Sequence, residues 1–181
     1  SGEPVDAATD DKTARLWDGT TGREIAVLEG HESAVTFAVF SSDGARLVTA
    51  SRDRTPHLWD AVTGREIALL RGHRDSVNSA AFSPDGTLVA TASDDATVRL
   101  WDAATGREIA VLRGHEGAVT SVVFSSDGAR LLTASRDTTA RNWWIGRTIR
   151  EALETAREAS SRELPPGDER KFFLSTDDRG P

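Results

Sequence analysis

The dipeptide Trp-Asp recurs at a fixed interval along this chain, and that interval constrains the fold more than any other feature. It stands at positions 17–18, 59–60 and 101–102, and Trp143 follows at the same 42-residue spacing. The dipeptide Gly-His recurs in the same phase, at 30–31, 72–73 and 114–115. Self-similarity at a fixed period of this length is typical of stacked copies of one supersecondary unit. The sequence therefore predicts a repeat protein.

Each repeat is predicted to form four short strands. In the third unit the strands are Ser76 to Phe82, Leu88 to Ser93, Val98 to Trp101 and Glu108 to Leu112, separated by turn sequences rich in Pro, Asp and Gly. Several four-stranded antiparallel units without helices favour radial packing. The expected fold class is all-β, with blades of four antiparallel strands, an incomplete ring per chain and a short helical C-terminal tail.

Composition excludes several classes of function. The net charge is −7 and the arginines alternate with acidic residues, a pattern that argues against nucleic acid as a partner. Cysteine is absent, which excludes disulfides and thiolate metal sites. No apolar run approaches the roughly 20 residues that span a bilayer, so a membrane is not an expected partner. We expect a cytoplasmic protein with no cofactor and no metal.

The phased Gly-His, Asp and Trp residues resemble the WD-repeat β-propeller family over roughly residues 5 to 144. In that family a blade has strands a (innermost) to d, and a His, a Ser or Thr, an Asp and the Trp form a hydrogen-bonded structural tetrad. By position, the resemblance implies three tetrads: His31, Thr49, Asp53 and Trp59; His73, Thr91, Asp95 and Trp101; His115, Thr133, Asp137 and Trp143.

An Asp, a His and a hydroxyl also describe a nucleophilic triad, so a hydrolase using Asp-His-Thr is an alternative. A catalytic group normally occurs once per site, whereas these residues recur wherever a repeat does, and this favours the structural reading. His57 lies outside the tetrads, on a strand where the next repeat has Arg99. We interpret it as a surface residue. No catalytic residue is predicted.

The two ends of the array depart from the repeat pattern. The first unit keeps Asp11 and Trp17 but has Ala7 where the Thr belongs, so it is predicted to contain strands b, c and d only. In the last unit Trp144 replaces the Asp, which leaves its strand d in doubt. Pro56 removes a ladder donor from the second unit and predicts a bulge or a frayed edge. The expected domains are 1–18 (a partial blade), 19–144 (the blades) and 145–181 (the tail).

About three blades cannot close a ring of the usual four to eight. A last unit lacking strand d is complementary to the first strand d of another copy, and exposed edges are templates for pairing. The contact is head-to-tail and closes if the rotation allows it. We expect a homo-oligomer, either a trimer of nine blades or a dimer of six to eight, in which residues 5–18 are displaced or form a three-stranded blade.

The tail has a different composition. Residues 148–159 carry a modest apolar helical stripe, a Pro-Pro-Gly break follows at 165–167, and 168–174 ends in Phe-Phe-Leu. We expect the tail to pack on the outer wall of the propeller, with a docking peptide as the alternative. Residues 162–172 are similar to tails of bacterial WD-repeat signalling proteins, such as protein kinases and STAND-class NTPases. This similarity suggests a bacterial multidomain protein whose upstream domains are missing.

The resemblance implies a binding surface at the top face of the propeller. The positions that would form it are Ala34, Thr36, Arg52, Ser76, Asn78, Asp94, Ala118, Thr120 and Arg136. Among these, Arg52 and Arg136 are the residue type most suited to anchoring a partner, which would then be acidic. The leading hypothesis is a non-catalytic protein–protein interaction scaffold. The alternative is a recently amplified or engineered self-assembling array with no ligand.

Overall fold

The computed structural model describes residues 12–146, which contain thirteen strands and no helical element. No described helix is therefore long and apolar enough to cross a membrane. In chain order the strands are β1 (Ala14–Trp17), β2 (Glu24–Leu28), β3 (Val35–Phe40), β4 (Arg46–Ser51), β5 (His57–Asp60), β6 (Glu66–Leu69), β7 (Val77–Phe82), β8 (Leu88–Ser93), β9 (Thr97–Asp102), β10 (Glu108–Arg113), β11 (Val119–Phe124), β12 (Arg130–Ser135) and β13 (Ala140–Trp144).

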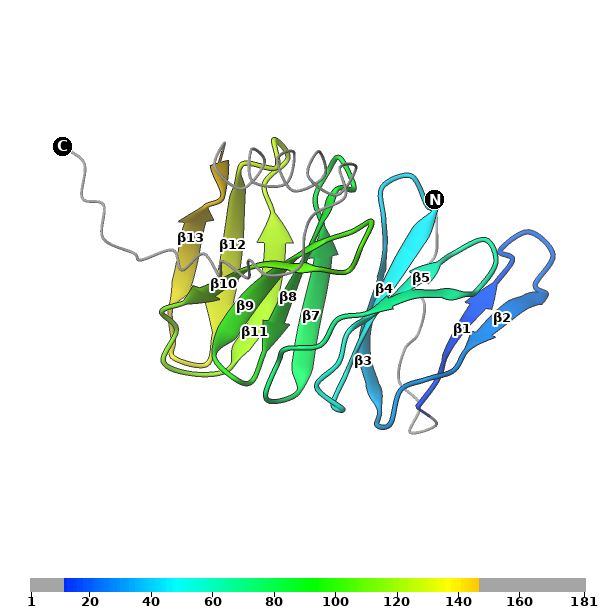
Figure 1. Ribbon diagram of the computed structural model, residues 1–181, viewed down its shortest axis with the longest axis horizontal. Helices are drawn as coiled ribbons and strands as arrows, with labels where there is room; N and C mark the ends of the chain where they lie inside the picture. Colours follow the sequence, from blue (N-terminus) through cyan, green and yellow to red (C-terminus); the bar gives the residue numbers. More distant parts are fainter. Residues whose placement is uncertain (1–11, 147–181) are drawn as a thin grey trace, which may run out of the picture.

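The strands form four antiparallel sheets, which we call blades 1 to 4. Blade 1 is β1–β2, blade 2 is β3–β4–β5–β6, blade 3 is β7–β8–β9–β10 and blade 4 is β11–β12–β13. Figure 1 shows them side by side in chain order, from blade 1 at the blue end to blade 4 at the yellow end. Within each blade every strand pairs with the next strand along the chain, whereas the last strand of one blade does not pair with the first strand of the next. Each blade is therefore a meander whose strands a to d run outward. The predicted all-β class and the open ring are confirmed.

Adjacent blades enclose the core. Leu28 of blade 1 packs with Leu47 and Trp59 of blade 2, and Leu58 packs with Val89 and Trp101 of blade 3. Successive side chains of a strand point to opposite faces of the sheet, and the central strands β4, β8 and β9 are buried along almost their whole length. Blades 2 and 3 are therefore covered on both faces by their neighbours. The repeat therefore depends on its neighbours for its stability.

Polar contacts tie the blades together as well. The Thr36 hydroxyl donates to the carbonyl of Val77 at 2.6 Å, across the junction of blades 2 and 3. The guanidinium of Arg46 donates to the carbonyls of Ala103 and Gly86, both at 3.0 Å. These bonds pair backbone carbonyls that no strand ladder serves, as buried polar groups require.

Pro56 shortens both β5 and the edge strand β6 at one end of the ladder. Strand β5 begins at His57, whereas its counterpart β9 begins two positions earlier in the repeat, at Thr97, which is equivalent to Thr55. The carbonyl of Pro56 still accepts a hydrogen bond from the Leu70 N–H at 2.9 Å, so one backbone bond toward the d-strand side is retained there. Compared with blade 3, the ladder of β5 lacks its first pair with β4 and its first two pairs with β6.

Several predictions fall outside the described residues. Strand b of the first unit lies within residues 1–11, and the two tail segments 148–159 and 168–174 lie within 147–181. The domain boundaries at 18/19 and 144/145 stay predictions. Blade 4 contains the expected strands a, b and c among the described residues.

Candidate functional site

One continuous series of hydrogen bonds joins the four residues of each predicted tetrad. The Trp indole Nε1 donates to the Thr hydroxyl at 2.9 Å in all three blades. The same hydroxyl lies 2.7–2.8 Å from the His Nε2, and the His Nδ1 lies 2.7–3.0 Å from an Asp Oδ2. The groups are Trp59–Thr49–His31–Asp53, Trp101–Thr91–His73–Asp95 and Trp143–Thr133–His115–Asp137.

The local sequence places each Asp at the bend between strands b and c. The residue after it takes a left-handed conformation, with φ of 75° at Arg54, 63° at Ala96 and 69° at Thr138. That bend points one carboxylate oxygen at the backbone N–H two residues on and the other at the His loop. Non-glycine residues rarely adopt this φ. Lys12, at the equivalent place in blade 1, also has a φ of 60° although Ala7 replaces the tetrad threonine there, so the b–c turn itself specifies this conformation.

Hydrogen bonds keep the tetrad carboxylates ionised. Burial acts to raise the pKa of Asp53, but hydrogen bonds from Thr55 and from the Glu32 backbone N–H outweigh burial and lower the pKa to about 2. The pKa of Asp95 is lowered against burial by hydrogen bonds from His73 and Thr97. An ionised acceptor fixes the histidine as an Nδ1–H donor, so its Nε2 accepts from the threonine hydroxyl.

This arrangement does not suit the threonine for nucleophilic attack. Thr49 and Thr91 are 0% exposed and Thr133 is 1% exposed, so a substrate has no access to the hydroxyl. The hydroxyl oxygen also accepts the indole N–H in each blade, which ties it to the core. The geometry is that of a structural network, in which each buried polar group has a partner.

His57 does not lie at the surface, and the sequence-based interpretation of it was wrong. It is 3% exposed and its ring stacks on Trp59 at 5.4 Å between ring centroids. Its Nδ1 hydrogen-bonds Glu66 at 2.7 Å, and burial, with the nearby His31, lowers its pKa. The covering segment is the Gly30 loop, where an added Cβ would lie 3.2 Å from the His57 Cε1. Glycine lets the loop close over the ring.

A nine-residue spacing was the signal for the pairing of His57 with Glu66. Arg15 pairs with Glu24 at 2.8 Å, and Arg99 pairs with Glu108, each across strands c and d. His57 and Glu66 have the same spacing, so His57 occupies the arginine position of a recurring cross-strand pair. Arg99 is itself only 8% exposed.

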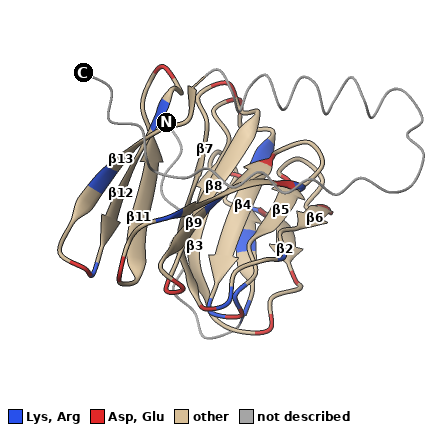
Figure 2. Ribbon diagram, turned by 60° about the vertical axis from the view of Figure 1, so that its left-hand side comes forward, with Lys and Arg blue, Asp and Glu red and all other residues tan. Residues whose placement is uncertain are grey.

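The top-face positions lie together at one end of the blades. The backbone N–H groups of Arg52, Asp94 and Arg136 donate to the carbonyls of Ala34, Ser76 and Ala118, which joins the b–c bend to the entrance of strand a in each blade. Thr36 and Asn78 bond to carbonyls of the next blade, and Thr120 bonds to the Ala134 carbonyl. Arg52 and Arg136 are exposed. Figure 2 shows basic and acidic residues interspersed over the loops.

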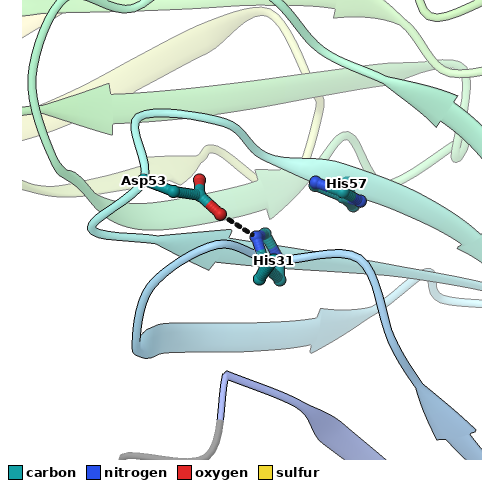
Figure 3. A group of neighbouring side chains, drawn as sticks. All are labelled: His31, Asp53 and His57. Atoms are coloured by element: carbon teal, nitrogen blue, oxygen red, sulfur yellow. Dashed lines mark hydrogen bonds and ion pairs between the residues drawn. The ribbon is translucent and has the colours of Figure 1, made fainter.

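One group of described residues has the composition of a cation site. His31, Asp53 and His57 each offer a ligand atom, and these atoms lie within 4.8 Å of one another. Figure 3 shows the His57 ring beside the hydrogen bond that joins His31 to Asp53. From the sequence, His31 and Asp53 were assigned to the tetrad and no metal was predicted.

The blades and their tetrads define a repeat protein of the β-propeller class. The family model described as "WD domain, G-beta repeat" matches residues 22–60, 64–102 and 106–143, and the chain belongs to this WD40 family. WD40 repeats are generally non-catalytic and indicate a protein-interaction propeller scaffold. A search of curated proteins finds no significant match.

Proposed function

We propose that the protein is a non-catalytic interaction scaffold whose open arc of blades is completed by another copy of the same chain. The outward apolar face of blade 4 is the observation that carries this proposal. Leu132 is 52% exposed on that face, whereas Val48 and Ala90, its counterparts in blades 2 and 3, are 0% exposed. An apolar face that is buried in blades 2 and 3 but exposed in blade 4 favours a protein partner of the same shape.

Blade 1 indicates which partner surface fits. Strands β1 and β13 occupy the same place in the repeat, and both carry Ala, Arg and Trp at matching positions. Strand β2 has the sequence EIAVL, which is also the start of β10. Strand β10 pairs with β9 in the same register, including the bulge, as β2 pairs with β1. In the proposed assembly β13 of one copy displaces β1 of the next and pairs with its β2.

This exchange joins blade 4 of one copy to blade 2 of the next. Strand β2 keeps its packing against blade 2, because Leu28 stays beside Leu47 and Trp59. Each chain then contributes three complete blades, which gives six blades in a dimer and nine in a trimer. Within the described residues blade 1 has two strands, and a two-stranded unit is marginal by itself, so β1 is the strand that we expect to be displaced.

Arg141 supplies a specific contact for this assembly. Its counterparts Arg15 and Arg99 pair with Glu24 and Glu108, but among the described residues no carboxylate pairs with Arg141. Its Nε is buried without a hydrogen-bond partner within the same residues, but so is that of Arg99, so the missing carboxylate alone distinguishes Arg141. Pairing of β13 with a second copy's β2 brings Glu24 of that copy to Arg141.

Sedimentation equilibrium of charge-reversed variants tests the strand exchange. Arg141→Glu places two carboxylates together and is expected to weaken association about five- to tenfold, in line with surface ion pairs of 0.2–1 kcal/mol plus repulsion. Adding Glu24→Arg to the same chain is expected to restore association. Arg65→Glu, a change in an exposed c–d turn, is the control. Equal association of the wild type and Arg141→Glu would contradict the proposed contact.

We propose an acidic protein segment as the external partner, bound by Arg52 and Arg136 at the top face. Both side chains are exposed at equivalent b–c bends, and arginine pairs well with carboxylates. Fluorescence anisotropy with a labelled polyglutamate peptide tests this. The double change Arg52→Glu and Arg136→Glu is expected to abolish binding, while Arg65→Glu and Arg107→Glu in the opposite turns leave it unchanged. An equal loss of peptide binding in the two double variants would attribute the effect to net charge alone. Absence of binding by the wild type would favour an array without a ligand.

We further propose that the array belongs to a cytoplasmic bacterial signalling protein. The similarity of residues 162–172 to tails of such proteins supports this proposal, and the interaction role of the repeats is compatible with it. Sequencing the genomic locus tests it. An in-frame kinase or NTPase domain upstream is expected, and a reading frame holding repeats alone would contradict it.

A further inference from the structure

Blade 2 differs from its neighbours beside the tetrad histidine. The position occupied by Arg99 in blade 3 and Arg141 in blade 4 is His57 in blade 2. The ring centroid of His57 lies 4.0 Å from that of His31, and the planes are tilted by 50°. An imidazole therefore stands where the other two blades place a permanent positive charge.

The Nε2 lone pair of His57 accepts no hydrogen bond of ordinary length from the described residues. Its Nδ1 faces the Glu66 carboxylate at 2.7 Å, so this nitrogen carries the proton and donates it. The Nε2 lies 3.4 Å from the Thr55 hydroxyl, which is long for a hydrogen bond. That hydroxyl has one proton, which it donates to Asp53 Oδ1 at a shorter distance. The Nε2 lone pair thus remains available to a cation.

We propose that His31, Asp53 and His57 bind a zinc ion. Two imidazoles and one carboxylate are a ligand set that Zn²⁺ prefers. Tetrahedral Zn–N and Zn–O bonds place ligand atoms about 3.4 Å apart, so the three atoms, now within 4.8 Å, need to move by about 1 Å. The ion takes the place of the proton between His31 Nδ1 and Asp53 Oδ2. That proton moves to the Nε2 of the same ring, which then donates to the Thr49 oxygen instead of accepting from it, and the Thr49 hydroxyl turns its own proton away from the ring.

Contacts around the ligands support this site. Glu66 holds the His57 ring through Nδ1, which is the carboxylate–histidine arrangement found behind many metal ligands. The Glu32 backbone N–H donates to Asp53 Oδ2 at 2.9 Å and fixes the carboxylate. Asp53 and His57 also line a cavity of about 300 Å³ between blades 2 and 3, which gives a water molecule access as the fourth ligand.

The charged side chains around the cavity do not by themselves attract a cation. Glu32 and Asp53 line it together with Arg54 and Arg71, so the acidic and basic side chains balance. The field alone does not concentrate cations there, and binding depends on the two imidazole nitrogens and the carboxylate. In blades 3 and 4 the same His–Asp pair stands beside an arginine, which repels a cation. The described residues therefore offer this site in blade 2 alone.

Isothermal titration of the tag-free full chain with ZnCl₂ tests the proposal by stoichiometry. The wild type is expected to bind one zinc ion, reversibly by EDTA. His57→Arg restores the residue of the neighbouring repeats and is expected to bind none, and Arg99→His is expected to bind two. Circular dichroism of each variant confirms that it is folded. Glu66→Gln is expected to weaken binding by roughly 10- to 100-fold, as for other supporting residues.

The internal repeats make each outcome decisive. One zinc ion bound by His57→Arg, or no second ion bound by Arg99→His, would overturn the assignment of the ligands. Absence of binding by the wild type would overturn the site itself. A thermal midpoint that rises with zinc in the wild type but not in His57→Arg is the second expected result, because a ligand that binds only the folded state stabilises it.

Discussion

His57 and Glu66 face each other across strands β5 and β6, with Nδ1 and Oε2 2.7 Å apart. The same register holds an arginine against a glutamate in blades 1 and 3. The repeat therefore specifies a cross-strand pair of opposite charge at this position, and blade 2 fills it with an imidazole.

The first prediction is that blade 2 tolerates the residue of its neighbours. In metal-free buffer, His57→Arg is expected to change the free energy of unfolding by less than about 1 kcal/mol, because an arginine pair with Glu66 replaces the imidazole pair. Urea denaturation measures this. His57→Ala leaves a cavity beside Trp59 and is expected to cost more, about 1–3 kcal/mol. A loss of unfolding free energy from His57→Arg as large as that from His57→Ala would show that the His57 position differs in structure from the Arg99 position.

The second prediction concerns the centre of a tetrad. Thr91→Val keeps the volume of the side chain but removes the hydroxyl that accepts from Trp101 and faces His73. The indole N–H and the imidazole Nε2 are then buried without partners, which is expected to cost about 1–3 kcal/mol each. Thr20→Val, in an exposed turn, is the control. A cost below 1 kcal/mol, measured by urea denaturation, would mean that the tetrad does not stabilise the blade.

The third prediction tests the packing between blades. At Gly106, with φ of 70°, an added Cβ would lie 2.4 Å from the Ala68 Cβ on the preceding blade. At Gly44, with φ of 69°, an added Cβ meets nothing within 4 Å. Both alanine variants carry the backbone strain of about 1–2 kcal/mol, but Gly106→Ala carries a further overpacking cost of about 1–3 kcal/mol. Equal thermal midpoints of the two variants would contradict the blade spacing.

The fourth prediction is a loss of stability in acid. The pKa of Asp53 is about 2 in the folded protein and near the ordinary 3.8 when unfolded, so the unfolded chain binds the proton more tightly. The stabilisation, on the order of 2 kcal/mol, is present above about pH 4 and is lost between about pH 4 and 2. Asp95 and Asp137 shift in the same direction. Urea midpoints in metal-free buffer should fall over that range, and less steeply in Asp53→Asn. A flat profile would contradict the ionised tetrads.

The sequence was sufficient for the parts of the structure that a repeat period determines. The predicted strand 88–93 has the same bounds as β8, and the three tetrads bring together the residues named by position. The burial of His57 was missed because only the residue types of His57 and Arg99 were compared. The glutamate nine residues after each of them, with which each side chain pairs, was not considered. The bonds of Thr36 and Asn78 to the next blade depend on how blades stack, which the period alone does not specify.

Light scattering coupled to size exclusion, applied to the wild-type chain over a range of concentrations, tests the central claim most directly. The exposed face of Leu132 and the unpaired outer edge of β13 among the described strands predict a defined assembly with twice or three times the mass of one chain. Asn142→Leu restores the buried leucine of the other c strands, Leu58 and Leu100, and should strengthen that assembly. A folded species with the mass of one chain at all concentrations would contradict closure by a second copy.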